Sequence, residues 1–103
     1  GGSETKTREK GYSDYGIEPK EAECLKGYCR KADAADKILI LHAAENANPS
    51  ISNDLFYSLV NGISYDRLMK IKYIPIKRDD FYAYQRKCLS TFRNFLLMCG
   101  QWE

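Results

Sequence analysis

The chain has 103 residues, of which 44% are hydrophobic and 29% charged, and it carries a formal net charge of +2. Its length supports one hydrophobic core and is too short for two comfortable domains, and its composition is that of an ordinary globular chain. No apolar run approaches the roughly 20 residues that a membrane helix needs, and the N-terminus lacks the apolar centre of a signal peptide, so we expect a cytoplasmic protein with no membrane partner.

The first residues are expected to stay outside the fold. Residues 1–13 begin with Gly-Gly-Ser and are rich in Thr, Lys, Glu and Arg, so they cannot bury enough apolar area to become ordered. We therefore expect a disordered tag or tail over residues 1–13 and a single helical domain over residues 14–101.

Two helices are predicted in the first part of this domain. Pro19 is tolerated in the first turn of a helix that runs to about Lys31. Asp33 can cap a second helix, which the segment 46–49 ends. The run Lys-Ile-Leu-Ile-Leu-His within it could also form a buried strand, but the flanking alanines and the absence of Val and Thr favour a helix.

Two shorter helices are predicted next. The third begins at Ser50 or Ser52, and Gly62 follows its end as the expected left-handed cap. Ser64 caps the fourth, and Asp66 in its first turn suits the helix dipole. The buried side of the fourth helix is assigned to three apolar residues: Leu68, Met69 and Ile71.

The last helix is the clearest element. Pro75 makes the chain turn over residues 73–76, with Ile74 and Ile76 filling the gap between helices. At 100° per residue, one stripe of the helix that follows is apolar: Phe81, Tyr84, Cys88, Phe92, Phe95, Leu96 and Cys99. Gly100 suits its C-cap. The expected fold class is therefore all-α, a small bundle of about five helices ending in a helix-turn-helix with a long C-terminal helix.

Residues 62–98 have the layout that DNA binding by a helix-turn-helix requires. A supporting helix, a short turn and a recognition helix with outward side chains can dock against the major groove. Basic residues are concentrated in this half of the chain. Residues 61–103 contain eight Lys and Arg against four Asp and Glu, whereas residues 1–60 contain eight against ten. Double-stranded DNA is therefore the expected partner.

Two groups of side chains are expected to contact the DNA. Base edges are assigned to residues near the exposed start of the last helix: Lys77, Arg78, Tyr82 and Arg86. Phosphates are assigned to other cations: Arg67, Lys70, Lys72, Lys87 and Arg93. Asp79 and Asp80 would repel phosphate, unless they serve the helix dipole or accept from a cytosine amino group. The alternative for the whole basic face is a solvated surface that keeps the protein soluble.

A sequence pattern runs through the same region: Gly62-Ile63-Ser64-Tyr65-Asp66, then Leu68, Ile74-Pro75 and Phe81, and finally Arg86-Lys87-Cys88-Leu89 and Phe92-Arg93. It resembles the fourth region of sigma factors and the small phage transcriptional regulators of the ArpU and RinA type. The resemblance covers about a third of the chain. It implies that the last helix enters the major groove and that the protein regulates transcription of a phage or mobile element. Pro75 departs from the pattern, since those families usually have a Ser cap there.

The sequence contains no motif of catalysis. The only histidine, His42, lies on the apolar side of a predicted helix, and there is no phosphate loop, HExxH or Ser-centred elbow. We therefore expect no enzyme activity and no cofactor. The cysteines fit helical patterns as small apolar thiols better than as zinc ligands or disulfides, so no metal site is expected. They are Cys24, Cys29, Cys88 and Cys99.

The second hypothesis is a protein-binding adaptor or inhibitor of a mobile element that does not bind DNA. Aromatic and arginine side chains suit interface hot spots as well as they suit nucleic acid. The candidate aromatic residues are Tyr57, Tyr65, Tyr73, Tyr82 and Trp102. The partner would then be host RNA polymerase or another host protein. A homodimer is also a candidate assembly.

Overall fold

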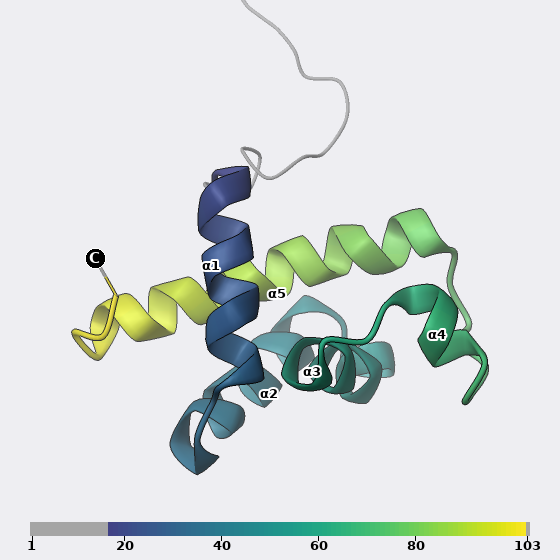
Figure 1. Cartoon of the computed structure of the whole chain (residues 1–103), viewed down its shortest axis with the longest axis horizontal. Coiled ribbons are helices and arrows are strands. Elements are labelled where there is room, and N and C mark those ends of the chain that lie inside the picture. Colours follow the sequence, from purple (N-terminus) through teal and green to yellow (C-terminus); the bar gives the residue numbers. More distant parts are fainter. Residues whose placement is uncertain (1–16, 103) are drawn as a thin grey trace, which may run out of the picture.

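The computed structural model describes residues 17–102, and this part of the chain contains only helices and their connections (Figure 1). The α-helices are α1 (Pro19–Arg30), α2 (Ala34–Ala47), α3 (Ser52–Asn61), α4 (Tyr65–Met69) and α5 (Arg78–Met98), and a short 3-10 helix, η2 (Pro49–Ile51), precedes α3. The predicted all-α bundle of about five helices with a long last helix is confirmed. The expected tail over residues 1–13 and the expected domain start at residue 14 lie outside the described residues.

Local capping signals start and stop the helices where the sequence predicts. The Asp33 carboxylate accepts a hydrogen bond from the Asp36 N–H at 2.9 Å, and the Ser64 hydroxyl accepts one from the Arg67 N–H at 3.3 Å. Each cap satisfies a backbone donor that has no partner within the first turn. Gly62 ends α3 with a φ of 65°, in the left-handed region where the missing Cβ removes the steric penalty.

The start of α3 resolves the choice between Ser50 and Ser52. Ser52 is the first residue of the helix, and its hydroxyl donates to the Pro49 carbonyl at 3.2 Å. Ser50 lies one turn earlier, in η2, where its N–H donates to the Asn48 side chain at 3.0 Å. Ser50 therefore belongs to η2, and Ser52 begins α3.

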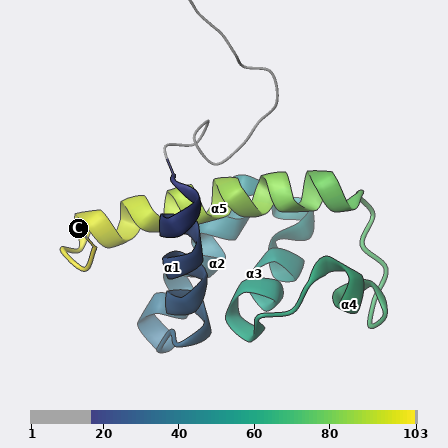
Figure 2. The same cartoon turned by 45° about the horizontal axis from the view of Figure 1, so that its top comes forward.

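Helix α5 is the element against which α1, α2, α3 and α4 all pack. Figure 1 shows α1 crossing it, and Figure 2 shows α2 and α3 beneath it with α4 beside its first residues. Among these neighbours, α2 makes the most extensive contact with α5. Five α5 side chains are fully buried in the resulting core: Phe81, Cys88, Leu89, Phe92 and Leu96. The middle of α5 is therefore enclosed, and its first residues project toward α4.

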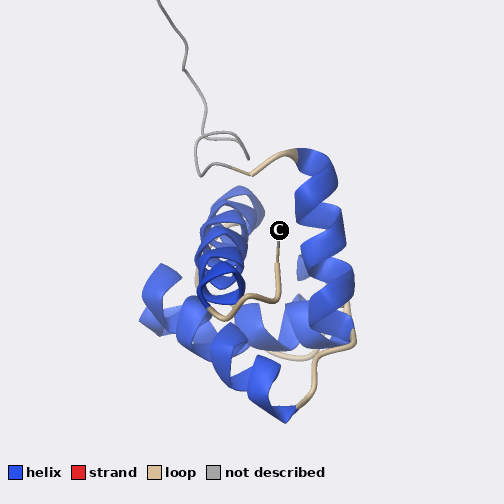
Figure 3. Cartoon of the chain, turned by 90° about the vertical axis from the view of Figure 1, so that its left-hand side faces the viewer, coloured by secondary structure: helices blue, strands red, loops and turns tan. Residues whose placement is uncertain are grey.

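The end of the described chain folds back onto α1. Figure 3 looks along α5 and shows the last residues lying between α5 and α1. The Trp102 indole N–H donates to Glu21 Oε2 at 2.8 Å, and the Tyr28 hydroxyl donates to Gln101 Oε1 at 2.9 Å. These bonds hold the C-terminal residues against the N-terminal helix.

The buried face of α5 is wider than the predicted stripe. Four predicted positions are buried: Phe81, Cys88, Phe92 and Leu96. Gln85 and Leu89 are also buried, whereas Tyr84 and Phe95 are half-buried and Cys99 is exposed. Tyr84 and Phe95 pack against the core, as predicted. The prediction was wrong for Cys99, because α5 ends at Met98 and helical periodicity does not place a residue beyond the helix.

Helix α4 is shorter than its apolar pattern suggests. It ends at Met69, so Ile71 lies in the turn that follows and is 65% exposed, contrary to the buried position that was predicted. Leu68 is buried, and Ile74 in the connector is 1% exposed, as expected. The 3.6-residue period predicts the direction of a side chain only within a helix. The prediction was wrong for Ile71 because α4 ends two residues before it.

Candidate nucleic-acid interface

The predicted helix-turn-helix forms a fixed corner. We call residues 65–80 the α4–α5 corner, which comprises α4, the connector and the first turn of α5. The Tyr65 N–H donates to the Tyr82 hydroxyl at 3.0 Å, and the Tyr65 hydroxyl donates to the Ile76 carbonyl. The Tyr65 and Phe81 rings lie 5.3 Å apart. One tyrosine thus ties α4 to both the connector and α5, so the exposed side chains of the corner project from a rigid base.

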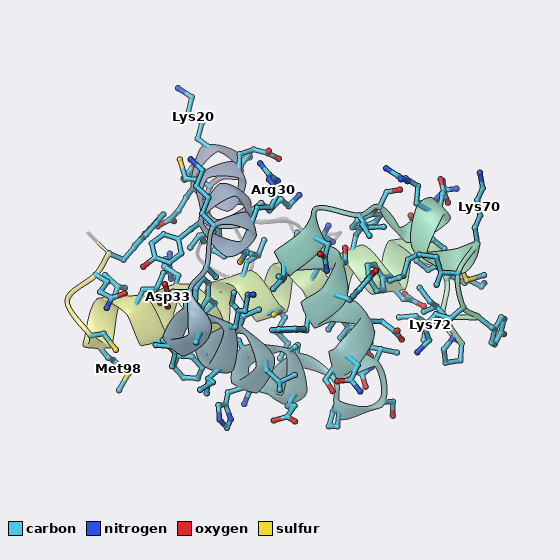
Figure 4. All side chains as sticks on the ribbon, turned by 60° about the horizontal axis from the view of Figure 1, so that its bottom comes forward. Lys20, Arg30, Asp33, Lys70, Lys72 and Met98 are labelled. Carbon is cyan, nitrogen blue, oxygen red and sulfur yellow. The ribbon has the colours of Figure 1, made fainter. Side chains whose placement is uncertain are left out.

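Exposed basic side chains are concentrated on this corner. Five cations on it are exposed: Arg67, Lys70, Lys72, Lys77 and Arg78. Figure 4 shows Lys70 and Lys72 at the end of the molecule formed by α4, with Lys70 directed away from the body. These five residues are all among the predicted DNA contacts, and all of them lie within residues 65–80.

Two of these cations form ion pairs of different character. Arg78 Nη2 lies 3.0 Å from Asp66 Oδ1, and both side chains are about 60% exposed, so the pair contributes little energy and can be exchanged for a phosphate contact. Lys72 Nζ lies 2.9 Å from Asp54 Oδ1, and the Asp54 side chain is only 7% exposed. That ammonium compensates a buried carboxylate, which makes Lys72 a structural residue. In the described part of the chain, three corner cations have no carboxylate partner: Arg67, Lys70 and Lys77.

Tyr82 faces the interior of the corner. It is half-buried, its hydroxyl accepts from the Tyr65 N–H, and its ring meets the Phe81 ring edge-on at 5.6 Å. These contacts fix the position of the Tyr82 ring, while its hydroxyl keeps a proton that it can still donate. The structure thus gives Tyr82 a positioning role.

Arg93 lies away from the corner, where α1 crosses α5. Its Nη1 is 3.2 Å from Glu21 Oε1, and the two side chains are 19% and 24% exposed. Glu21 also accepts from Trp102, so one carboxylate joins α1, α5 and the C-terminal residues. Arg86 and Lys87, in the middle of α5, are half-buried. Of the α5 cations that were predicted to contact DNA, only Arg78 is therefore exposed.

Two exposed features of the corner bear on its chemistry. Asp79 and Asp80 lie in the first turn of α5, where carboxylates interact favourably with the helix dipole, but they also add negative charge beside Lys77.

In the connector, Ile71 and Tyr73 are 65% and 75% exposed. In the sequence, Ile71 and Tyr73 alternate with lysines over residues 70–73, shortly before Pro75. This alternation is the signal from which the exposed apolar pair could have been predicted. An exposed aromatic ring among cations suits stacking on a base or packing against a protein.

The cysteines divide into an exposed and a buried pair. Cys24 and Cys99 are exposed, and Cys29 and Cys88 are buried, with no disulfide among them. Burial raises the pKa of the Cys29 thiol to about 12, and it also raises the pKa of the Cys88 thiol. Because the thiolate is the reactive form, we expect Ellman's reagent at pH 8 to titrate two thiols in the native protein and all four in guanidinium. Rapid reaction of four thiols under native conditions would contradict the buried positions.

His42 and the acidic residues do not form a site. His42 is on the exposed side of α2, with its Nδ1 3.8 Å from Glu45 Oε1 and a side chain that is 65% exposed. The predicted apolar location was wrong, because α2 is apolar on nearly all sides and its pattern does not indicate which side faces the core. Within residues 17–102, no group of three or more His, Cys, Asp or Glu side chains could hold a metal ion.

No family model, curated protein or solved structure significantly matches the chain. Among the described helices, none combines the length and the apolar character that crossing a bilayer requires.

Proposed function

We propose that the chain binds double-stranded DNA through the α4–α5 corner and acts as a transcriptional regulator of a phage or mobile element. The observation that supports this most is the presence of four exposed cations on one corner in addition to the structural Lys72, namely Arg67, Lys70, Lys77 and Arg78. Phosphate contacts dominate the affinity of proteins for DNA, and they need cations that are already presented on one surface. The sequence pattern over Gly62-Ile63-Ser64-Tyr65 and the last helix supports the regulatory role by resemblance.

In this proposal, the role of each cation is assigned from the exposure of its side chain and from its ion pairs. Arg67, Lys70 and Lys77 neutralise phosphates, because they are exposed and have no carboxylate partner in the described part of the chain. Arg78 leaves its exposed pair with Asp66 to reach a phosphate or a guanine edge. The first turns of α5 approach the groove, and the half-buried Arg86 and Lys87 mark the limit of that approach.

The test is a fluorescence-anisotropy titration of the protein with a labelled duplex at several salt concentrations. Each phosphate contact contributes about 0.9 to the slope of log affinity against log salt, so three to four contacts predict a slope of roughly −2.7 to −3.6. A complex whose affinity does not change with salt, or no binding at low salt, would contradict the proposal.

The exposed apolar residues of the corner favour a second candidate, a protein-binding adaptor whose partner is host RNA polymerase or another host protein. Tyr57, Ile71 and Tyr73 are 42%, 65% and 75% exposed. Tyr57 and Ile71 line a shallow cavity of about 300 Å³ beside the Lys72–Asp54 pair. Aromatic side chains beside such a cavity are typical of interface hot spots. In this case Tyr73→Ala would abolish partner binding, and the complex would respond little to salt.

A further inference from the structure

A polar cavity lies at the junction of α1, α3 and α5, next to the start of α4. Its volume is about 200 Å³. The polar side chains that line it come from four segments: Lys26 and Arg30 from α1, Ser58 from α3, Ser64 from the connection to α4, and Tyr82 and Gln85 from α5. Among residues 17–102, none that lines the cavity carries a carboxylate.

Both cations of this cavity come from α1. Arg30 is exposed, and its stem lies over Gly62, where a Cβ would come within 2.7 Å of Arg30 Cδ. Figure 4 shows the Arg30 side chain leaving α1 on the side of α3 and α4. The Lys26 side chain is only 24% exposed, and its nearest carboxylate is that of Glu23, at 3.7 Å with 74% exposure. A half-buried ammonium with such a loose partner retains most of its capacity to attract an anion.

The uncharged side chains of the cavity retain O–H and N–H groups that can donate hydrogen bonds to a ligand. The Tyr82 hydroxyl accepts from the Tyr65 N–H, and the Ser64 hydroxyl accepts from the Arg67 N–H, so both keep their own protons for donation. The Gln85 amide, in a residue that is 5% exposed, uses one N–H to donate to Ser58 Oγ at 3.3 Å and has a second. Within the described part of the chain, the cavity thus presents two cations and three donors and no acidic group.

We propose that this cavity binds a phosphate group, with Lys26 and Arg30 supplying charge and Ser64, Tyr82 and Gln85 supplying hydrogen bonds. Oxyanions are bound in proteins by converging donors and cations of this kind. The volume is below the roughly 300–1,000 Å³ of sites for drug-sized ligands. The cavity therefore holds one phosphate group, and the remainder of a larger ligand lies outside it.

The experiment is a ¹⁵N-HSQC titration with inorganic phosphate and with adenosine monophosphate, using sodium chloride at matched ionic strength as the reference. We expect saturable shifts at the amides of Gly62, Ser64, Tyr82 and Gln85. Because a hydrogen bond to a charged group is worth about 1.5–3 kcal/mol, Arg30→Gln and Lys26→Gln should each weaken binding by roughly tenfold or more. The matched control, Lys20→Gln with Lys37→Gln, should bind as the wild type does.

Two further measurements are needed. The first shows whether the phosphate group belongs to DNA or to a free compound, and the second tests the cavity proposal independently of the DNA proposal. If Lys26→Gln with Arg30→Gln also lowers affinity for duplex DNA, the group comes from the DNA backbone; if DNA affinity is unchanged, the ligand is a free phosphate compound. Neutralising Arg67, Lys70 and Lys77 should leave phosphate binding in the cavity intact even where DNA binding fails. Shifts that do not saturate, or that are the same in the Arg30→Gln protein, would overturn the cavity proposal.

Discussion

The triple variant Arg67→Gln, Lys70→Gln and Lys77→Gln is expected to bind duplex DNA roughly 100-fold more weakly than the wild type at low salt. Three lost phosphate contacts of about 1 kcal/mol each give this factor, because 1.4 kcal/mol corresponds to tenfold. The slope of log affinity against log salt should also fall by between about 2 and 3. All three residues are exposed and lack carboxylate partners in the described part of the chain, so the fold should be unaffected. Lys72 is excluded from the variant because it compensates Asp54.

A variant with the same change in net charge provides the control. Lys20, Lys31 and Lys37 are exposed on or next to α1 and α2, outside the corner. Their replacement by glutamine should reduce DNA affinity only slightly. Equal losses in the two triple variants would show that affinity depends on overall charge and not on the α4–α5 corner.

Phe92→Ala is expected to destabilise the protein by about 3–5 kcal/mol. The Phe92 ring is 0% exposed, and it meets the Tyr28 ring edge-on at 5.8 Å where α1 crosses α5. Truncation leaves a cavity at this crossing that the neighbouring helices cannot fill. The loss is large compared with the 5–15 kcal/mol that typically stabilises a domain. Urea unfolding followed by circular dichroism measures it.

Leu97→Ala is the matched control on the same helix. Its side chain is 44% exposed, and it should cost less than about 1 kcal/mol, because surface substitutions seldom exceed that. Similar losses at positions 92 and 97 would contradict the assignment of Phe92 to the core.

Helix boundaries were predictable because their signals are local. Asp33 and Ser64 each accept a hydrogen bond from an N–H three residues later, and Gly62 directly follows the helix that it ends. Such signals depend only on residue type and short spacing. Ile71 shows the limit of this reasoning, because its exposure depends on where α4 ends.

The parts of the site that were not predictable depend on contacts between residues far apart in the chain. Arg93 pairs with Glu21, 72 residues away, because α1 crosses α5 at that point. Tyr82 turns inward because the Tyr65 N–H, 17 residues earlier, needs an acceptor. In both cases a position on the polar side of one helix is covered by another element, which the periodicity of a single helix cannot show.

The most direct test of the central claim is a ¹⁵N-HSQC titration of the protein with a short DNA duplex, with the shifts mapped onto the chain. The account predicts that the largest shifts fall on residues 65–80, continue into the first turns of α5, and are absent from α2 and from the part of α5 around Arg93. Largest shifts on α2 or on the C-terminal half of α5, with residues 65–80 unchanged, would contradict it.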